Sequence, residues 1–269
     1  MYPVRNGIPL LLSPQSADRL SHLKQTAENI QVRSRLARYP LLEKLAHFLR
    51  PPHPFLDPAG NVQRARMGAI LLEKFSQPAI LDIGSGLDSK NLEGLPLSLR
   101  PRCACLDIRP APGVSVAADG HELPFSGESF EGILLQGVLE HVPEPYQLIR
   151  EAYRVLKPGG LIYVEVPFLQ HFHYSPDDFY RYTLHGLEHI LRDFRKIEDG
   201  VLSGPGSALC DFLTEAPAAF FRSSLIYWGI KWVGGWLTLP LKYLDWFYRV
   251  PERAHMMSGA LFFLGAKEE

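Results

Sequence analysis

The segment Ala79-Ile-Leu-Asp-Ile-Gly-Ser-Gly-Leu87 constrains the fold most, because an apolar run ends in an acid and then in a Gly-x-Gly turn. The run is too short for a stable helix, and its isoleucines and leucine favour a strand buried on both faces of a parallel sheet. Asp82 would then lie at the carboxyl end of that strand, where open α/β sheets bind ligands. Gly84 and Gly86 lack Cβ atoms, so the main chain can adopt positive φ and approach a ligand closely.

Two further acids follow short apolar runs. Asp107 ends the run that begins at Cys103 and lies 21 residues after Gly86. Nucleotide-binding α/β folds place a carboxylate for the ribose hydroxyls at about this distance from the turn. Asp119 follows the apolar run from Val114 to Ala118. A Gly-x-Gly turn with one strand-end acid before it and two after it therefore predicts a nucleoside-binding site at one edge of a sheet.

Together with Val138-Leu-Glu-His-Val142 and Arg154-Val-Leu-Lys-Pro-Gly-Gly-Leu161, these motifs resemble the class I S-adenosylmethionine-dependent methyltransferases, in particular the quinone-biosynthesis methylases. The resemblance extends from Leu81 to about Leu191. It implies an α/β fold with a Rossmann-like seven-stranded sheet, mostly parallel with the last strand antiparallel, and S-adenosyl-L-methionine as cofactor. The cofactor-binding residues that it implies are Asp82, Gly84, Ser85, Gly86, Asp107, Ile108, Asp119, Gly120, His121 and Gln136.

The chain also departs from this family pattern. Asp88 stands where a third glycine is common, and Glu131 with Gly132 replaces the usual Asp and its apolar neighbour. The methionine end of the cofactor is therefore less constrained than the ribose end.

A non-catalytic cofactor-binding scaffold or partner subunit stays open as an alternative. A nicotinamide-dependent oxidoreductase is less favoured, because Asp82 precedes the glycines and Ser89 stands at the third dinucleotide glycine.

Methyl transfer from a sulfonium depends mainly on alignment, and a base is needed when the acceptor is a hydroxyl. We expect methylation of oxygen in a small-molecule or a lipid- or glycan-linked acceptor. The candidate catalytic residues are His173 and His141, although either could instead hold a loop in place. The candidate substrate contacts are His171, Tyr174, Asp178 and Arg181, of which Asp178 and Arg181 could form a loop-fixing ion pair. We expect no metal, because His171 and His173 lack identifiable further ligands.

The composition of the chain limits the kinds of substrate, metal site and compartment that we expect. The chain has 28 basic and 29 acidic side chains, a net charge of −1, which disfavours a nucleic-acid substrate. Its three cysteines form neither a disulfide framework nor a zinc set. No secretory signal is visible, and the uncharged run 232–241 is too short to span a bilayer. We therefore expect a cytoplasmic protein, with peripheral contact to the inner face of the membrane left open.

Five segments are expected along the chain. Residues 1–15 form a hairpin-like segment resembling the tail of zinc-ribbon methyltransferase activators, without their cysteines. A helical cap (16–66), the cofactor-binding core (67–203), an aromatic-rich helical insertion (204–252) and the final core strand (253–269) follow. Aromatic and basic residues alternate within 220–248, which suits a lipid headgroup region, a lid or a homodimer contact. The pattern also predicts helices over 62–75, about 89–95, 143–156 and 183–194, the last with Thr183 as its cap. It predicts strands over 161–166, 194–201 and 258–265.

Overall fold

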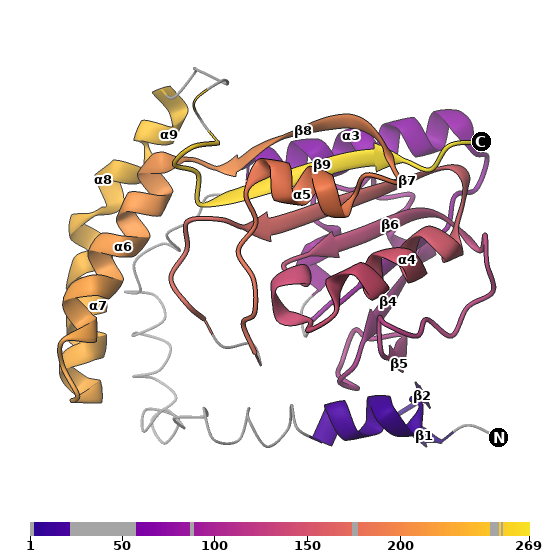
Figure 1. Cartoon of the computed structure of the whole chain (residues 1–269), viewed down its shortest axis with the longest axis horizontal. Coiled ribbons are helices and arrows are strands. Elements are labelled where there is room, and N and C mark those ends of the chain that lie inside the picture. Colours follow the sequence, from indigo (N-terminus) through magenta and orange to yellow (C-terminus); the bar gives the residue numbers. More distant parts are fainter. Residues whose placement is uncertain (1–2, 22–57, 87–88, 174–176, 248–252, 254) are drawn as a thin grey trace.

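The computed structural model describes residues 3–21, 58–86, 89–173, 177–247, 253 and 255–269 (Figure 1). Most of the expected helical cap, residues 22–57, lies outside the described residues, and so does Tyr174. Residues 14–21 are helical, so this helix begins two residues before the expected cap. Helix α3 (Pro58–Lys74) continues past the expected boundary at residue 66 into the core. The resemblance of the first residues to an activator tail stays a prediction.

The described residues contain one sheet of nine strands in the order β1-β2-β5-β4-β3-β6-β7-β9-β8. Seven of them form the expected Rossmann-like sheet. They are β3 (Ile80–Ile83), β4 (Cys103–Asp107), β5 (Val116–Ala118), β6 (Phe130–Gln136), β7 (Leu156–Pro167), β8 (Arg195–Ser203) and β9 (Ala260–Ala266). As predicted, the last strand, β9, is antiparallel to both of its neighbours.

The sheet is two strands wider than the sequence predicted. Strands β1 (Val4–Arg5) and β2 (Ile8–Leu11) form the expected hairpin, whose turn residues Asn6 and Gly7 have φ of 52° and 80°. Such positive φ values suit the turn that closes a two-residue hairpin. β2 then pairs in parallel with β5, which the local pattern of the hairpin could not reveal. The hairpin thereby covers an edge of the sheet beside the end of β5.

Helices cover both faces of the sheet. On one face, α3 places Met67 and Leu71, each fully buried, against the strands. The other face carries α4 (Pro145–Val155) and α5 (Leu184–Ile190), on the viewer's side in Figure 1. Thr183 caps α5 as predicted, since its Oγ1 accepts a hydrogen bond of 3.1 Å from the Gly186 N–H.

Short 3-10 turns connect several of these elements. They are η2 (Ser89–Leu92), η3 (Arg100–Arg102) and η4 (Leu139–His141). The short helix expected over 89–95 is therefore only the turn η2. It ends before Gly94, which has a φ of 88° and lies so close to Asn61 that a Cβ atom would clash with its carbonyl oxygen.

The insertion between β8 and β9 is helical, as expected. It contains α6 (Pro205–Ala219), α7 (Ser224–Leu237), α8 (Leu239–Lys242) and α9 (Leu244–Phe247). These helices form a lobe beyond one end of the sheet, at the left of Figure 1. Ser203 pairs with Ala260, so the strands that flank the insertion lie side by side. Among the described residues, no helix combines the length and hydropathy of a membrane span.

Candidate functional site

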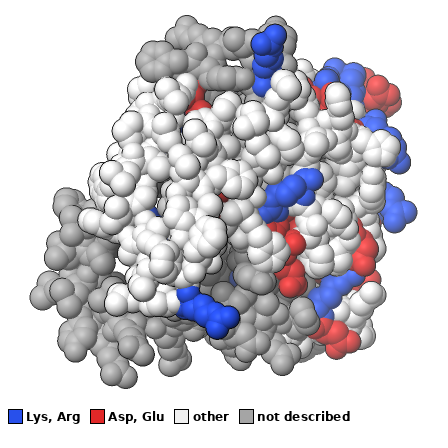
Figure 2. Space-filling view, turned by 60° about the vertical axis from the view of Figure 1, so that its left-hand side comes forward, with Lys and Arg blue, Asp and Glu red and all other residues white. Residues whose placement is uncertain are grey.

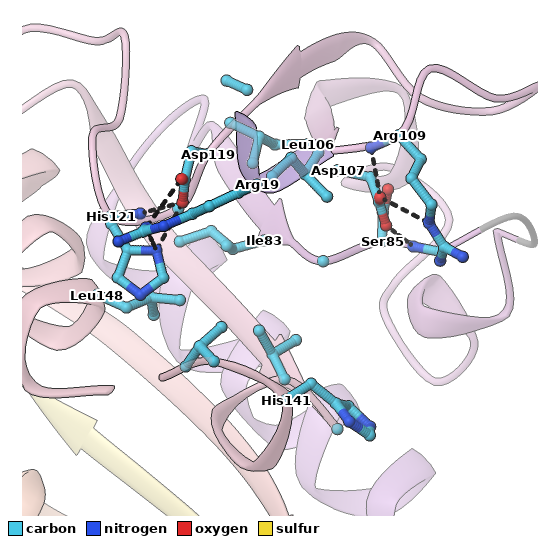
Figure 3. A pocket seen from close by; sticks show the side chains of 18 of the residues that line it. Arg19, Ile83, Ser85, Leu106, Asp107, Arg109, Asp119, His121, His141 and Leu148 are labelled. Atoms are coloured by element: carbon cyan, nitrogen blue, oxygen red, sulfur yellow. Dashed lines mark hydrogen bonds and ion pairs between the residues drawn. The ribbon is translucent and has the colours of Figure 1, made fainter. Parts of the chain in front are cut away.

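A cavity of about 500 Å³ lies at the carboxyl ends of β3, β4, β5 and β6 (Figure 3). The order of the strands reverses between β3 and β6, and open α/β sheets bind ligands at such a point. All the predicted cofactor residues except Asp82 line this cavity, and so does His141. The lining residues that were predicted are Gly84, Ser85, Gly86, Asp107, Ile108, Asp119, Gly120, His121, Gln136 and His141.

The turn after β3 brings bare main chain to the wall of the cavity. Gly84 and Gly86 have φ of 72° and 68°, a conformation that favours glycine. A Cβ atom on Gly84 would lie 2.5 Å from Val138 Cγ2, whereas one on Gly86 would meet nothing within 4 Å. Gly84 is thus required by packing, and Gly86 leaves open space for a ligand.

The Asp107 carboxylate is fixed by main-chain donors. Its Oδ2 accepts a hydrogen bond of 3.0 Å from Gly86 N–H, and its Oδ1 accepts one of 2.9 Å from Arg109 N–H. The Arg109 side chain also lies beside Oδ1, as the dashed lines in Figure 3 show. These contacts orient the carboxylate and tie the end of β4 to the Gly-x-Gly turn.

The Asp119 carboxylate is held from two sides. His121 contacts Oδ1 through its main-chain N–H (3.0 Å) and its Nδ1 (2.6 Å), and Arg19 Nη1 donates to Oδ2 (3.0 Å). Although burial raises the pKa of Asp119, the hydrogen bonds from His121 and the charge of Arg19 outweigh it and bring the pKa to about 2. Arg19 also bonds Glu144 and lines the cavity.

Arg19 was not predicted from the sequence. It lies 100 residues before Asp119, and no local pattern marks it. The hairpin places it, because β2 pairs with β5 and the helical residues 14–21, which include Arg19, follow directly after β2.

Asp82 lies beneath the cavity and does not line it. Successive side chains of a strand point to opposite faces, and Ile83 is the one that faces the cavity. Burial, reinforced by Cys105, raises the pKa of Asp82 to about 8. Its Oδ1 lies 3.5 Å from Asn91 Nδ2, and its Oδ2 has no hydrogen-bond partner among the described residues.

Gln136 is oriented by a buried arginine that the sequence did not point to. Arg64 of α3 donates to Gln136 Oε1 (2.6 Å) and to the Glu93 carbonyl (2.7 Å), and it forms an ion pair with Glu165. Gln136 Nε2 donates in turn to the Asn91 carbonyl at 3.0 Å. The network connects α3 to the ends of β6 and β7 below the cavity.

His141 is the predicted catalytic residue that reaches the cavity. Its Nδ1 lies 2.5 Å from the Asp177 carbonyl, which can only accept, so Nδ1 carries the proton and Nε2 keeps its lone pair. Burial lowers the pKa of His141, which keeps the ring neutral at pH 7.

The neighbouring Glu140 was not predicted. Burial raises its pKa to about 7, and its Oε2 has no hydrogen-bond partner among the described residues. Its Oε1 lies 3.7 Å from His141 Nε2. Only its place in the Leu-Glu-His motif could have drawn attention to it.

The loop after β7 holds the remaining predicted residues, and none of His171, His173, Asp178 and Arg181 is among the described residues that line the cavity. Asp178 and Arg181 form the ion pair that the sequence left open, with Nη2 to Oδ2 at 2.7 Å. His173 donates its main-chain N–H to Asp178, and its ring lies 5.2 Å from the His141 ring.

His171 joins this loop to the insertion. Its Nδ1 lies 2.8 Å from both carboxylate oxygens of Asp211 on α6, and this hydrogen bond raises the pKa of His171. In the described part of the chain, two clusters each contain three potential metal ligands. The first is Glu140, His141 and His173, and the second is His171, Asp211 and Glu215. In the second, Lys231 already pairs with Glu215. The expected absence of a metal stays a prediction.

Part of the chain is similar to known proteins. Residues 81–164 match a family model described as a methyltransferase domain. An uncharacterised methyltransferase of Mycobacterium tuberculosis is 51% identical over 51 residues, 19% of this chain and 20% of that protein. A methyltransferase of Mycobacterium leprae, also uncharacterised, is 47% identical over 53 residues, 20% of each chain. The chain thus spans about a fifth of the length of the curated relatives it matches.

Solved structures with a similar arrangement were also found. One is the 1,6-didemethyltoxoflavin-N1-methyltransferase of Burkholderia thailandensis, with 14% identity, a TM-score of 0.46, and coverage of 100% of this chain and 93% of that one. Another is the phosphoethanolamine N-methyltransferase 2 of Haemonchus contortus in complex with S-adenosyl-L-methionine. It has 18% identity, a TM-score of 0.44, and coverage of 76% of this chain and 53% of that one.

Proposed function

We propose that this protein transfers a methyl group from S-adenosyl-L-methionine to a small-molecule or a lipid- or glycan-linked acceptor, because residues 81–164 match the family model of a methyltransferase domain. One observation carries the proposal. The Gly-x-Gly turn, Asp107 and Asp119 meet in one cavity of about 500 Å³, a volume typical of small-molecule and cofactor sites.

Each wall of the cavity has a role in this proposal. Asp107, oriented by Gly86 and Arg109, accepts hydrogen bonds from the two ribose hydroxyls. Asp119 meets the adenine amino group, with Gly120 and His121 beside it. The methionine part follows the main chain at Gly84, Ser85 and Gly86, and the side chain of Gln136 closes that end.

The acceptor would enter beside His141, Asp177 and Phe179, which line the same cavity. We favour a hydroxyl acceptor, because the neutral His141 ring has a free Nε2 lone pair that can take its proton. The sulfur–methyl bond breaks as the oxygen–methyl bond forms, and S-adenosylhomocysteine leaves. His173, Asp178, Arg181 and His171 hold the loop that carries Asp177 and Phe179.

Calorimetry tests cofactor binding. We expect binding of S-adenosylmethionine and S-adenosylhomocysteine and none of NAD. Asp107→Ala should weaken S-adenosylmethionine binding by about tenfold or more, because a charge-assisted hydrogen-bond pair is lost. Asp193→Ala, a change of the same kind at an exposed position, is the control. Binding of NAD alone would favour the oxidoreductase, and cofactor binding without turnover on any acceptor would favour the scaffold.

His141→Gln tests the base once an acceptor is found. General base catalysis contributes roughly 10²–10⁴-fold, so kcat should fall by that order while the affinity for S-adenosylmethionine stays within a few-fold. Because burial lowers the pKa of His141, the parent rate should decline only below the usual range near 6.5. An unchanged kcat would remove His141 from the chemistry and leave the cofactor site untouched.

A further inference from the structure

The lobe of α6 to α9 has an almost wholly apolar surface. Among the exposed side chains that the structure describes between residues 205 and 246, only Arg222 is charged. Phe220 and Leu225, on either side of Arg222 where α6 turns into α7, are 86% and 85% exposed. Figure 2 brings this lobe forward as a broad white face, with red and blue side chains gathered mainly toward the right.

Both long helices of the lobe turn their apolar stripe outward. On α6, Leu209, Phe212 and Leu213 are exposed at helical spacing, while Cys210 and Asp211 are buried. On α7 the exposed stripe includes Trp228, Trp232 and Trp236, one turn apart. A surface helix in water normally buries such a stripe and exposes its polar face. In this lobe the apolar stripes of α6 and α7 face the solvent instead.

The acids of the lobe are all engaged internally. Asp211 bonds His171, and Glu215 bonds Lys231 and the Tyr227 hydroxyl. Asp245 accepts hydrogen bonds from the main-chain N–H groups of Gly206 and Ser207. The exposed charge that remains in the described lobe is therefore one cation, placed at the most apolar end.

We infer that the α6–α7 hairpin inserts into the headgroup and acyl boundary of one leaflet of an anionic phospholipid bilayer. Tryptophans rank among the side chains most enriched at this depth, and a cation beside an apolar tip complements anionic headgroups. The helices have 15 and 14 residues, about 22 and 21 Å at 1.5 Å per residue, whereas the hydrocarbon core is about 30 Å thick. A second copy docked through the same described lobe would bring another Arg222 and no exposed acid to meet it.

The lobe also adjoins the proposed acceptor side. His171, bonded to Asp211, belongs to the loop after β7, and that loop continues to Asp177 and Phe179 in the cavity wall. A bilayer at the lobe would therefore bring a lipid-anchored acceptor to the His141 side of the cavity. This last step rests on the proposed methyltransferase function, whereas binding to the bilayer does not.

Intrinsic fluorescence gives a direct test, because the four tryptophans of the chain all lie in this lobe. The full chain is titrated with vesicles of phosphatidylglycerol and phosphatidylcholine. We expect a blue shift of the emission and quenching by brominated acyl chains, both weaker with phosphatidylcholine alone. An emission unchanged by either vesicle would overturn the inference.

Matched variants locate the contact. Leu225→Glu should weaken vesicle binding more than tenfold, and Arg222→Glu should abolish the preference for anionic vesicles. Leu97→Glu, the same substitution at a side chain that is 76% exposed on the core, should bind like the parent. Equal losses in Leu225→Glu and Leu97→Glu would overturn the inference, as would a Leu225-dependent dimer in ultracentrifugation that does not bind vesicles.

A parallel titration with S-adenosylmethionine separates the two proposals. Leu225→Glu should keep the parent's cofactor affinity, which also shows that the variant is folded. Vesicle binding by a chain that ignores S-adenosylmethionine would sustain the membrane contact and refute the proposed function.

Discussion

Arg19 and Asp119 connect two parts of the chain that are 100 residues apart. We predict that Arg19→Ala weakens S-adenosylmethionine binding about tenfold, roughly 1.4 kcal/mol, because the Asp119 carboxylate loses one of the donors that orient it. Arg19→Lys should recover part of the affinity for S-adenosylmethionine. Its single ammonium group can bond Asp119, but it cannot also bond Glu144 as the second guanidinium nitrogen of Arg19 does. Calorimetry measures both, with the exposed Arg102→Ala as control. Equal affinities in Arg19→Ala and the parent would show that Arg19 serves only the fold.

Glu140 makes stability depend on pH. Burial raises its pKa from 4.5 to about 7, so the folded chain keeps a proton that the unfolded chain loses. Its favourable contribution is complete below pH 4.5 and is lost as the pH rises to about 7, a change of roughly 3 kcal/mol.

The Glu140→Gln variant removes this titration. We expect Glu140→Gln to be more stable than the parent at pH 8 and nearly equal at pH 4.5. Urea unfolding at the two pH values measures the difference. Glu122→Gln, an exposed change of the same kind, should follow the parent at both. A stability gap that does not change with pH would contradict the prediction.

At the scale of elements, the N-terminal hairpin completes the edge of the sheet next to β5 and Asp119. Leu11 pairs with Ala118 and packs against the main apolar core. Leu11→Asp should lower the free energy of unfolding by about 2 kcal/mol, because it places a charge in this contact. Val4→Asp, at a position 66% exposed in the same hairpin, should change it little. Urea unfolding compares the two, and similar losses would mean that the hairpin contributes no specific packing.

The elements differ in how far the sequence revealed them. Strand β3 and its turn follow from local chemistry, since buried strands need apolar side chains and the turn needs glycines at positive φ. Helices α4 and α5 follow from helical periodicity and from the Thr183 cap. The pairing of β2 with β5 does not, because a short strand can add to any open edge and its own residues do not say which.

At the scale of the whole molecule, the insertion is separable from the cofactor site. None of the described residues that line the cavity belongs to 205–257, and Ser203 pairs with Ala260 across the base of the insertion. Replacing 205–257 by a short Gly-Ser linker should therefore keep S-adenosylmethionine affinity within about threefold, or roughly 0.7 kcal/mol, and abolish vesicle binding. Calorimetry and sedimentation with vesicles check the two results. Loss of both together would mean that the lobe supports the core, for example through the Asp211 contact with His171.

The sequence by itself determined the central sheet, the Gly-x-Gly turn and the acids at the ends of β4 and β5. These depend on side-chain size, polarity and backbone freedom within a few residues of one another. Only the tertiary structure decided that Arg19 meets Asp119, that Asp82 lies beneath the cavity, and that His171 ties its loop to Asp211. It also decided that the aromatic stripe of α7 faces outward. Such contacts join residues far apart in the chain, and their energies depend on burial and on partners that no local pattern specifies.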